Sequence, residues 1–535
     1  MEKIKVEKTA SRGIAIAPVY YYQEPDLTPD SRDIQKELVS AETERFENAR
    51  AAVLEELEIL AEKNEIFAAH QEIAGDFMLQ EGVTSKIQGE LKNAEAALDA
   101  TIQELAAIFA GMDDAYMKER AADVKDVGKR LMARMKGMDL PDLGNMASEA
   151  IVVARDLFPS DTVKMNPEFV KGILTEEGGV TSHVSIMAKS MNIPTLVGVK
   201  GIMSKVKDGG LVCMDAESGT IVVEPDQDTR DEYASKKEAY EKEREMLIQL
   251  RTREAVTKSG KRVFLCANVG NLEDIKRALE MNIDGVGLFR SEFLYMENTH
   301  FPTEEEQFEV YREAASLCPQ ELTIRTLDIG GDKELSYFEF DKEDNPFLGW
   351  RAIRISLEMK EMFKEQLRAI LRASAFGHVR IMFPMIISLS ELQEAKALVE
   401  ECKGELKAEG KEFDENIETG MMMETPASVL LAEEFAKEAD FFSIGTNDLT
   451  QYLLAVDRGN KKISHKYDFM HPAVLKAIRQ IIEAGHKENI KVGMCGEMAG
   501  NTQAVPVLLE MGLDEFSMSA GSIDYVRRLV LEFDA

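Results

Sequence analysis

The sequence lacks the features that would place the protein in a membrane, among disulfide-rich proteins or on nucleic acid. Five cysteines among 535 residues are scattered, odd in number and without CxxC spacing, which excludes a disulfide framework and argues against a cysteine-type zinc site. No apolar run approaches the ~20 residues that cross a bilayer, and the N-terminus lacks the apolar core of a secretory signal. Basic residues are outnumbered, with 64 Lys and Arg against 97 Asp and Glu. The net charge of −33 disfavours nucleic acid and anionic membranes as partners, and we expect a cytoplasmic protein.

The length predicts three or four domains, at roughly 150 residues each. Residues 1–22 contain short β-rich stretches, and residues 33–138 are rich in Ala, Glu, Leu and Lys. Apolar side chains in this second segment recur at spacings of three and four, as in the stripe Leu54, Leu57, Leu60 and Ala61. Because only a helical period gathers such side chains on one face, we expect a cluster of amphipathic helices. His70 within it either faces a partner or occupies an ordinary helix position.

Short apolar runs of strand length follow the helical segment, separated by Gly and Asp turns. They lie at 150–154, 172–174, 194–199, 210–214 and 220–223. We interpret residues 1–30 and 142–224 as one α/β domain, interrupted by a helical insertion at 31–141. Residues 225–257 are mostly charged and favour helix, which is typical of a solvated linker helix.

Residues 258–535 repeat a pattern of an apolar strand followed by an amphipathic helix. The eight expected strands are 263–267, 285–289, 322–327, 379–385, 420–423, 441–444, 491–494 and 515–518. Eight such units favour a closed (β/α)8 barrel over a doubly wound open sheet. The predicted fold class is therefore multidomain α/β, with an inserted helical domain and a C-terminal (β/α)8 barrel.

Most residues at or just after the ends of the expected barrel strands, where such barrels carry their active sites, are polar or charged. These residues are Asn268, Arg290, Arg325, Met385, Glu424, Asn447, Asp448, Cys495 and Glu497. Val, Ile or Leu would dominate if these positions only filled the core. The strand ends therefore predict a functional site.

A second candidate site is His183, in the run Gly178-Gly179-Val180-Thr181-Ser182-His183. Two glycines permit a tight turn and the hydroxyls can cap a following helix, which places His183 at or near a helix N-terminus. The dipole of that helix stabilises an anion attached to the imidazole. A satisfied core histidine is the alternative, but the glycine turn and the hydroxyls favour a phosphorylated histidine.

The cations of the barrel indicate an anionic ligand. Arg290 and Arg325 lie at the ends of strands that look buried, where an unpaired guanidinium is costly. Arginine forms bidentate contacts with phosphate and carboxylate. Lys333 adds a further positive charge, although simple solvation is the alternative for Lys333 and for Arg458.

Carboxylates and a thiol accompany these cations at the barrel mouth. Glu424 and Asp448, with Asn447 beside them, offer the hard oxygen ligands that suit Mg²⁺; alternatively, one carboxylate only pairs with a barrel arginine. Cys495 would be a small buried hydrophobe on residue type alone. Its flanking glycines and its position at the mouth favour a proton donor.

Several long motifs resemble enzyme I of the bacterial phosphotransferase system, in collinear order over nearly the whole chain. They are residues 120–124 within 118–131, 178–189, 285–293, 325–333, 345–351, 424–426 and 443–449. The resemblance implies a phosphoenolpyruvate–protein phosphotransferase that performs the first step of sugar transport. Phosphoenolpyruvate would bind with Mg²⁺ at the barrel mouth and pass its phosphoryl group to His183 on a swivelling domain. That domain would deliver it to the phosphocarrier HPr, docked on the helical insertion, and the barrel would form a homodimer.

The resemblance also implies a role for each matching residue. Arg290, Arg325, Lys333 and Arg458 would hold phosphate and carboxylate, Arg351 would shape the phosphate end, Asn447 would orient the substrate, Glu424 and Asp448 would bind the metal, and Cys495 would protonate the enolate carbon. Three positions depart from the family pattern, because Val180 and Lys189 stand where arginine is usual and Arg12 stands where proline is usual. We expect these departures to tune phosphohistidine stability or partner choice.

Two other functions compete with this interpretation. A dikinase-like enzyme would share the swivelling histidine and the barrel, but it needs an ATP-binding domain, and the chain has neither the length nor a P-loop-like glycine run for one. A regulatory paralogue would bind the partner without turnover, and the departures at Val180 and Lys189 motivate it. The sequence also leaves open whether a sugar-linked or a nitrogen-linked carrier is served.

Overall fold

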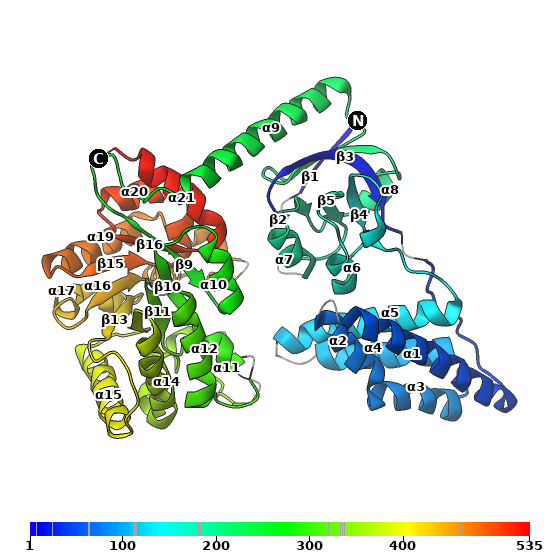
Figure 1. Ribbon diagram of the computed structural model, residues 1–535, viewed down its shortest axis with the longest axis horizontal. Coiled ribbons are helices and arrows are strands. Elements are labelled where there is room, and N and C mark those ends of the chain that lie inside the picture. Colours follow the sequence, from blue (N-terminus) through cyan, green and yellow to red (C-terminus); the bar gives the residue numbers. More distant parts are fainter. Residues whose placement is uncertain are drawn as a thin grey trace. The chain divides into compact units, whose positions relative to one another are not determined.

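The computed structural model describes the whole chain except residues 7, 24, 62–64, 111–114, 180–182, 297, 319, 332, 334, 336, 461 and 535. It forms two compact units, Met1–Arg244 and Glu245–Ala535 (Figure 1). The boundary falls within the long helix α9, Gln227–Leu250. Among the described helices, none combines the length and the apolar character needed to cross a membrane.

The first unit contains an eight-stranded sheet with the order β1-β8-β7-β3-β4-β5-β6-β2. Its strands are β1 Glu2–Lys5, β2 Thr9–Ser11, β3 Ile14–Tyr21, β4 Ala150–Ala154, β5 Val170–Thr175, β6 Thr195–Leu196, β7 Leu211–Asp215 and β8 Thr220–Val223. β3 pairs with β4 in parallel and with β7 antiparallel. The N-terminal strands and the later strands therefore form one sheet, as predicted.

The strand β4 in the middle of the sheet is buried on both faces, which its sequence explains. Along β4, Ile151 and Val153 belong to one apolar cluster, whereas Val152 and Ala154 belong to another, because successive side chains point to opposite faces. The short helices that accompany the sheet are η2 Leu143–Asn145, α6 Pro159–Val163, α7 His183–Ser190 and α8 Ile202–Lys205. The strand expected at 194–199 is shorter than predicted, because Gly198 has φ +72° and the chain turns there.

The predicted helical insertion is confirmed as a set of helices with an apolar core of its own. They are η1 Lys36–Leu38, α1 Val39–Ala61, α2 Glu65–Gly75, α3 Phe77–Gly89, α4 Ala94–Ala110 and α5 Ala115–Lys136. Leu57 is fully buried, and Leu54, Leu60 and Ala61 pack against the same core. His70 is also fully buried, with Nε2 3.3 Å from Asp123 Oδ1, so the alternative in which it faces a partner is wrong.

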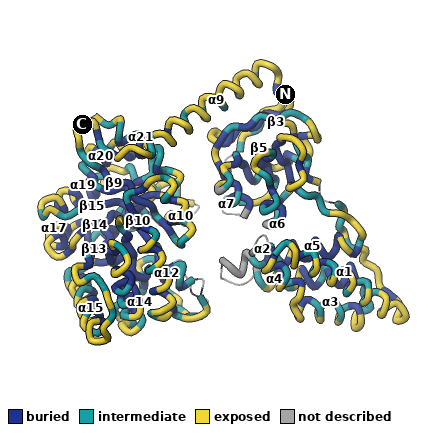
Figure 2. The backbone as a smooth tube through the Cα atoms, viewed as in Figure 1, coloured by how far each residue is buried: buried dark blue, intermediate teal, exposed yellow. Residues whose placement is uncertain are grey.

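The second unit is a closed barrel in which all eight strands are parallel, which confirms the predicted (β/α)8 fold. The strands are β9 Phe264–Val269, β10 Gly285–Arg290, β11 Leu322–Arg325, β12 Val379–Phe383, β13 Glu418–Met423, β14 Phe441–Ile444, β15 Lys491–Met494 and β16 Glu515–Met518. Figure 2 shows these strands buried at the centre of the unit. An open sheet is thereby excluded.

Helices surround the barrel (Figure 1). They are α10 Leu272–Leu279, α11 Glu292–Met296, α12 Glu304–Leu317, η3 Pro346–Leu348, α13 Ile353–Glu358, α14 Lys360–Ala373, η4 Ser374–Phe376, α15 Leu389–Ala408, α16 Pro426–Leu430, α17 Ala432–Phe435, α18 Thr446–Leu454, η5 Ser464–Lys466, α19 Pro472–Lys487, η6 Glu497–Gly500, α20 Val505–Glu510 and α21 Ala520–Glu532. Capping boxes at Thr303 and Ser388 start α12 and α15, because each hydroxyl and the Glu three residues later satisfy free N–H groups.

The inside of the barrel is layered. Ile381 and Phe383 of β12 pack outward among the core residues shared with the helices, whereas Met382 joins a separate small cluster with Leu288, Met422 and Phe441. This alternation is expected for a closed barrel filled by side chains. The apolar layer separates a charged floor at the strand starts from the strand ends.

The floor of the barrel is a buried group of four charges. Arg380 lies 2.6 Å from Glu321 and 3.4 Å from Glu515, and Lys491 lies 3.1 Å and 2.7 Å from the same two carboxylates. Burial and the neighbouring Glu515 charge raise the pKa of Glu321 to about 7. Burial alone would raise the pKa of Glu515. The charges of Lys491 and Arg380 outweigh burial and lower the pKa of Glu515 to about 2.

We expect the stability of the barrel to fall as the pH rises from about 4.5 through about 7. In this window the folded chain keeps a proton on Glu321 that the unfolded chain releases, so the free energy of unfolding decreases by up to about 1.4 kcal/mol per pH unit. Chemical denaturation at several pH values measures this slope. Glu321→Gln should make this slope shallower, whereas Glu418→Gln should not, because Glu418 is a half-exposed carboxylate near Arg380. An unchanged slope in Glu321→Gln would contradict the assignment.

Candidate functional site

The predicted strand-end residues are brought to one face of the barrel. Arg290 and Arg325 are the last residues of β10 and β11, Glu424 follows β13 directly, and Cys495 follows β15. Asn447 and Asp448 lie in the first turn of α18, directly after β14. Because all strands are parallel and neighbours around the barrel, these side chains share its C-terminal mouth.

Arg325 and Lys333 are held by two buried carboxylates, Glu292 and Asp328, that the sequence reasoning did not single out. Arg325 lies 2.5 Å from Glu292 and 3.0 Å from Asp328. Lys333 lies 2.8 Å and 3.1 Å from the same two carboxylates. Glu292 follows the strand-end Arg290 by two residues, and Asp328 follows Arg325 by three. This short spacing from a strand end is the signal that could have identified both carboxylates. The simple solvation considered for Lys333 is wrong, because the ammonium group is paired.

Arg351 extends this ion network toward the next strands. Its guanidinium lies 2.9 Å from Asp328 and 3.3 Å from Asp448, and it donates to the Tyr452 hydroxyl at 3.2 Å. Arg351 and Arg325 each keep a buried Nε–H group without an acceptor in the described part of the chain. The network therefore retains donors that an anionic ligand can use.

Glu424 differs from Glu292 and Asp328, two other buried carboxylates of the mouth, because the nearby arginines do not offset the burial and the carboxylate charges around it. Burial and the charges of Asp448 and Asp328 raise its pKa to about 8, against the opposing effect of Arg325 and Arg351. For Asp328, burial is outweighed by Lys333, Arg325 and Arg351, which hold its pKa well below the usual range. The backbone N–H of Met385, a residue with φ +60°, donates to Glu424 Oε1 at 2.7 Å.

The Glu424 and Asp448 pair fits a hard divalent cation. Asp448 Oδ1 is buried and has no hydrogen-bond partner among the described residues. A cation between two such carboxylates would relieve the repulsion that raises the Glu424 pKa and would give the orphan oxygen a partner. The alternative in which one carboxylate pairs with a barrel arginine is also partly realised, because Asp448 contacts Arg351.

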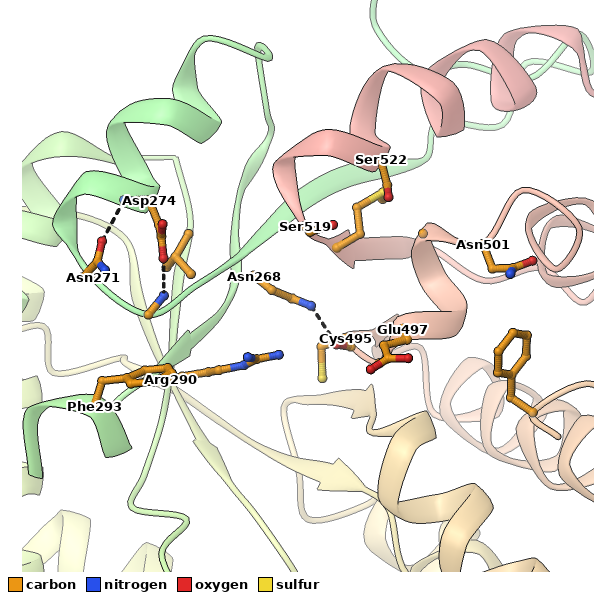
Figure 3. Close-up of a pocket in the computed structure, with 16 residues that line it drawn as sticks. Asn268, Asn271, Asp274, Arg290, Phe293, Cys495, Glu497, Asn501, Ser519 and Ser522 are labelled. Carbon is orange, nitrogen blue, oxygen red and sulfur yellow. Dashed lines mark hydrogen bonds between the residues drawn. The ribbon is translucent and has the colours of Figure 1, made fainter. Parts of the chain in front are cut away.

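Two arginines of the mouth have no side-chain partner in the described part of the chain. The guanidinium groups of Arg290 and Arg458 form no hydrogen bond or ion pair with any residue that the structure describes. Arg458 is exposed, whereas Arg290 is half-buried and points toward Cys495 in Figure 3. A half-buried cation without a counter-ion at the edge of a cavity is arranged to receive an anion.

The cavity beside Arg290 has a volume of about 490 Å³ and includes Cys495, Asn268 and Glu497 in its lining (Figure 3). Cys495 is buried, and burial raises the pKa of its thiol to about 11 despite the nearby arginines. The thiol is therefore protonated at neutral pH. Asn268 Nδ2 donates to the Cys495 carbonyl at 2.8 Å, and Asn447 Oδ1 accepts from the Glu497 N–H at 3.1 Å.

A glycine is required beside Cys495 because the strand-end loops pack closely. A Cβ at Gly496 would lie 1.8 Å from Thr446 Oγ1. The loop after β15 therefore lies against the start of α18, which carries Asn447 and Asp448. This contact fixes the thiol relative to the proposed metal ligands.

His183 is the first residue of α7, as predicted, and lies in the first unit rather than in the barrel. The turn before it uses Gly178 at φ +96°, and Ser185 Oγ donates to the Gly179 carbonyl at 2.7 Å. Val180 lies outside the described residues, and Lys189 is exposed on the helix. The helix start offers the N–H groups that stabilise an anion.

Three family models match the chain in collinear order. They describe PEP-utilising enzymes: the N-terminal domain over residues 8–120, the mobile domain over 146–219 and the PEP-binding domain over 244–535. The phosphoenolpyruvate-protein phosphotransferase of Bacillus subtilis (strain 168) is 47% identical over 524 residues, which cover 96% of this chain and 92% of the relative. The relative of the same name from Staphylococcus aureus (strain MRSA252) is 45% identical over 540 residues, covering 99% of this chain and 94% of the relative.

We expect Arg290→Gln to weaken the binding of a small phosphate-bearing anion such as phosphoglycolate by about 10- to 100-fold, because a charge-assisted contact is lost. Titration calorimetry with Mg²⁺ present measures the affinity. Arg312→Gln, which removes an exposed arginine paired with Glu309 on α12, is the matched control. Equal affinities for wild type and Arg290→Gln would show that this arginine does not contact the anion.

Proposed function

We propose, because this chain belongs to the family of phosphoenolpyruvate-protein phosphotransferases, that it moves the phosphoryl group of phosphoenolpyruvate in two steps. The first step transfers the group to His183 and leaves pyruvate. The second step delivers it to a histidine of a small carrier protein of the HPr type. The observation that carries this proposal is the barrel mouth. Arg290, which has no partner among the described residues, lines a cavity there with Cys495, and the paired cations and the Glu424 and Asp448 carboxylates stand at the other strand ends of the same mouth.

The side chains of the mouth would bind different parts of phosphoenolpyruvate. Arg290, Arg325, Lys333 and Arg458 would hold the phosphate and the carboxylate, and Arg351 would shape the phosphate end. Asn447 would orient the substrate. Little covalent help is needed for in-line phosphoryl transfer beyond positioning and neutralisation of charge.

Glu424 and Asp448 would hold Mg²⁺. Bound there, the ion supplies positive charge to the phosphate oxygens during transfer. The two carboxylates proposed as ligands are a small set, which would suit an ion that keeps several of its waters.

Cys495 would complete the reaction at carbon. When the P–O bond breaks, the electron pair remains on the enolate oxygen, and a proton must reach the methylene carbon to give pyruvate. The Cys495 thiol holds such a proton at neutral pH, and Arg290 and Arg325 lie near enough to lower its pKa and so stabilise the thiolate that results. The proton is then replaced from solvent through the cavity.

The helical insertion would dock the carrier protein. Its exposed surface includes the large apolar side chains Ile59, Phe77, Met78 and Ile108. Contact with a protein partner would remove these side chains from water. Transfer from the labelled protein to sugar-linked and nitrogen-linked HPr-type carriers would show which system, sugar transport or another, is served. We place the reaction in the cytoplasm, where such a carrier would be met.

The barrel would form a homodimer. Three consecutive strand-end loops, after β11, β12 and β13, carry the exposed apolar residues Leu348, Ile387 and Leu430. Because these strands are neighbours, their loops gather on one side of the mouth. Apolar side chains grouped in this way mark a surface that a second copy can cover.

Incubation with labelled phosphoenolpyruvate and Mg²⁺ tests the first step. We expect one acid-labile phosphoryl group per chain in the wild type and none in His183→Ala, because the nucleophilic nitrogen is gone. His300→Gln, at an exposed histidine of the barrel, should label like the wild type. No label on the wild type would favour a regulatory paralogue, and full label on His183→Ala would exclude this histidine.

We expect Cys495→Ala to lower the steady-state rate of pyruvate formation by about 10²-fold, the typical contribution of a general acid. Phosphoryl transfer to His183 does not require the thiol, so a single labelling turnover should slow less. Pyruvate formed in D₂O from stereospecifically labelled phosphoenolpyruvate should carry deuterium on one face in wild type and on both faces in the variant. Cys402→Ala, at a buried cysteine of α15, is the control. Retained stereospecificity in Cys495→Ala would assign the proton to another group.

A further inference from the structure

A fully buried glutamine lies behind the two arginines of the barrel mouth. Gln366 belongs to α14, on the face that also buries Phe363, Leu367 and Ile370. A primary amide in such an apolar setting costs free energy unless its donors and acceptor are all paired. The contacts of Gln366 therefore show why a polar side chain is placed there.

Gln366 binds both strand-end loops that carry the candidate arginines. Its Oε1 accepts the Leu327 N–H at 2.9 Å, in the loop after β11. Its Nε2 donates to Ser291 Oγ at 3.0 Å, in the loop after β10, and to the Tyr311 hydroxyl at 3.3 Å. Ser291 Oγ in turn donates to the Arg325 carbonyl at 2.7 Å.

The hydrogen bonds form a closed circuit between the two loops. Each proton in it has one acceptor, and the Leu327 N–H fixes the orientation of the amide, since Oε1 alone can accept it. Ser291 is fully buried and stands between Arg290 and Glu292, and Leu327 stands between Arg325 and Asp328. The circuit therefore sets the spacing at which Arg325 meets both Glu292 and Asp328.

We propose that Gln366 is a positioning residue of the phosphotransfer site, which holds the loops after β10 and β11 so that Arg290 and Arg325 face one phosphate together. The inference rests on the proposed function. The effect is geometric, because a displacement of a binding group by about 1 Å can cost about 10²-fold in rate. Gln366 itself reaches none of the reacting atoms.

A second buried glutamine provides a matched control. Gln307 of α12 is also fully buried and also makes three hydrogen bonds, accepting from the Tyr295 and Tyr311 hydroxyls at 3.2 Å and 3.1 Å and donating to the Pro302 carbonyl at 2.9 Å. Through these bonds Gln307 reaches neither Ser291 nor Leu327, the two residues by which Gln366 holds the strand-end loops, although it shares the Tyr311 hydroxyl with Gln366 and contacts Tyr295 of α11. Loss of stability without loss of positioning is therefore the expected result of its substitution.

The test compares Gln366→Met and Gln307→Met in the full-length protein, by thermal unfolding, phosphoglycolate affinity and the rate of His183 labelling. Both variants should unfold at lower temperature. We expect Gln366→Met to lose at least tenfold in kcat/KM for phosphoenolpyruvate and about as much in phosphoglycolate affinity, whereas Gln307→Met should stay within about threefold of wild type. If Gln366→Met does not fold, Ser291→Ala replaces it in the test, because this change removes only one hydroxyl of the circuit. Ser291→Ala should also lower the phosphoglycolate affinity.

A double-mutant cycle separates positioning from general loosening. In an Arg290→Gln background the effect of Gln366→Met on kcat/KM should shrink to less than half, because the two act on the same contact. Full additivity, or equal losses in Gln366→Met and Gln307→Met, would overturn the inference. A wild-type protein that takes no label on His183 would instead contradict the proposed function, so the two failures are distinguishable.

Discussion

Pairing of buried charge is the constraint on which the barrel mouth depends. Arg325 is almost fully buried, and a guanidinium in that position is tolerated only beside carboxylates. Glu292 and Asp328 supply them from the loops after β10 and β11. Removing one member of such a buried pair typically costs about 3–5 kcal/mol. The two loops are therefore bound to each other by electrostatics as well as by the hydrogen bonds beneath them.

The charges of the mouth are not all paired with one another. Glu292 and Asp328 are balanced by Arg325, Lys333 and Arg351, but Glu424 is not balanced, and Arg290 has no carboxylate partner in the described chain. One region is short of positive charge and its neighbour is short of negative charge. A cation and an anion bound together would satisfy both, which is the combination that a metal-bound phosphate ester provides.

The sequence predicted what depends on local pattern and on the direction of parallel strands. The eight strands, the side chains at their ends and the position of His183 at a helix start all follow from periodicity, glycine turns and the rule that strand ends share one face. Pairings between loops were not predictable, because the link from Asp328 to Arg351 and the amide of Gln366 depend on how distant segments meet. The burial of His70 was undecided for the same reason, since a polar residue on a helix can face either water or a core.

The helix α9 has few buried residues along its length, and this affects its stability. Of its 24 residues only Tyr233 and Leu247 are buried, and between them the helix is supported mainly by ion pairs between its own side chains, such as Lys236 with Glu232 and Lys242 with Glu238. Each such exposed pair contributes only about 0.3–0.5 kcal/mol and weakens in salt. An isolated helix of this kind is close to its own melting point. Unwinding of the midsection would leave both hydrophobic cores intact, and we expect rising ionic strength to favour it, because salt weakens these ion pairs.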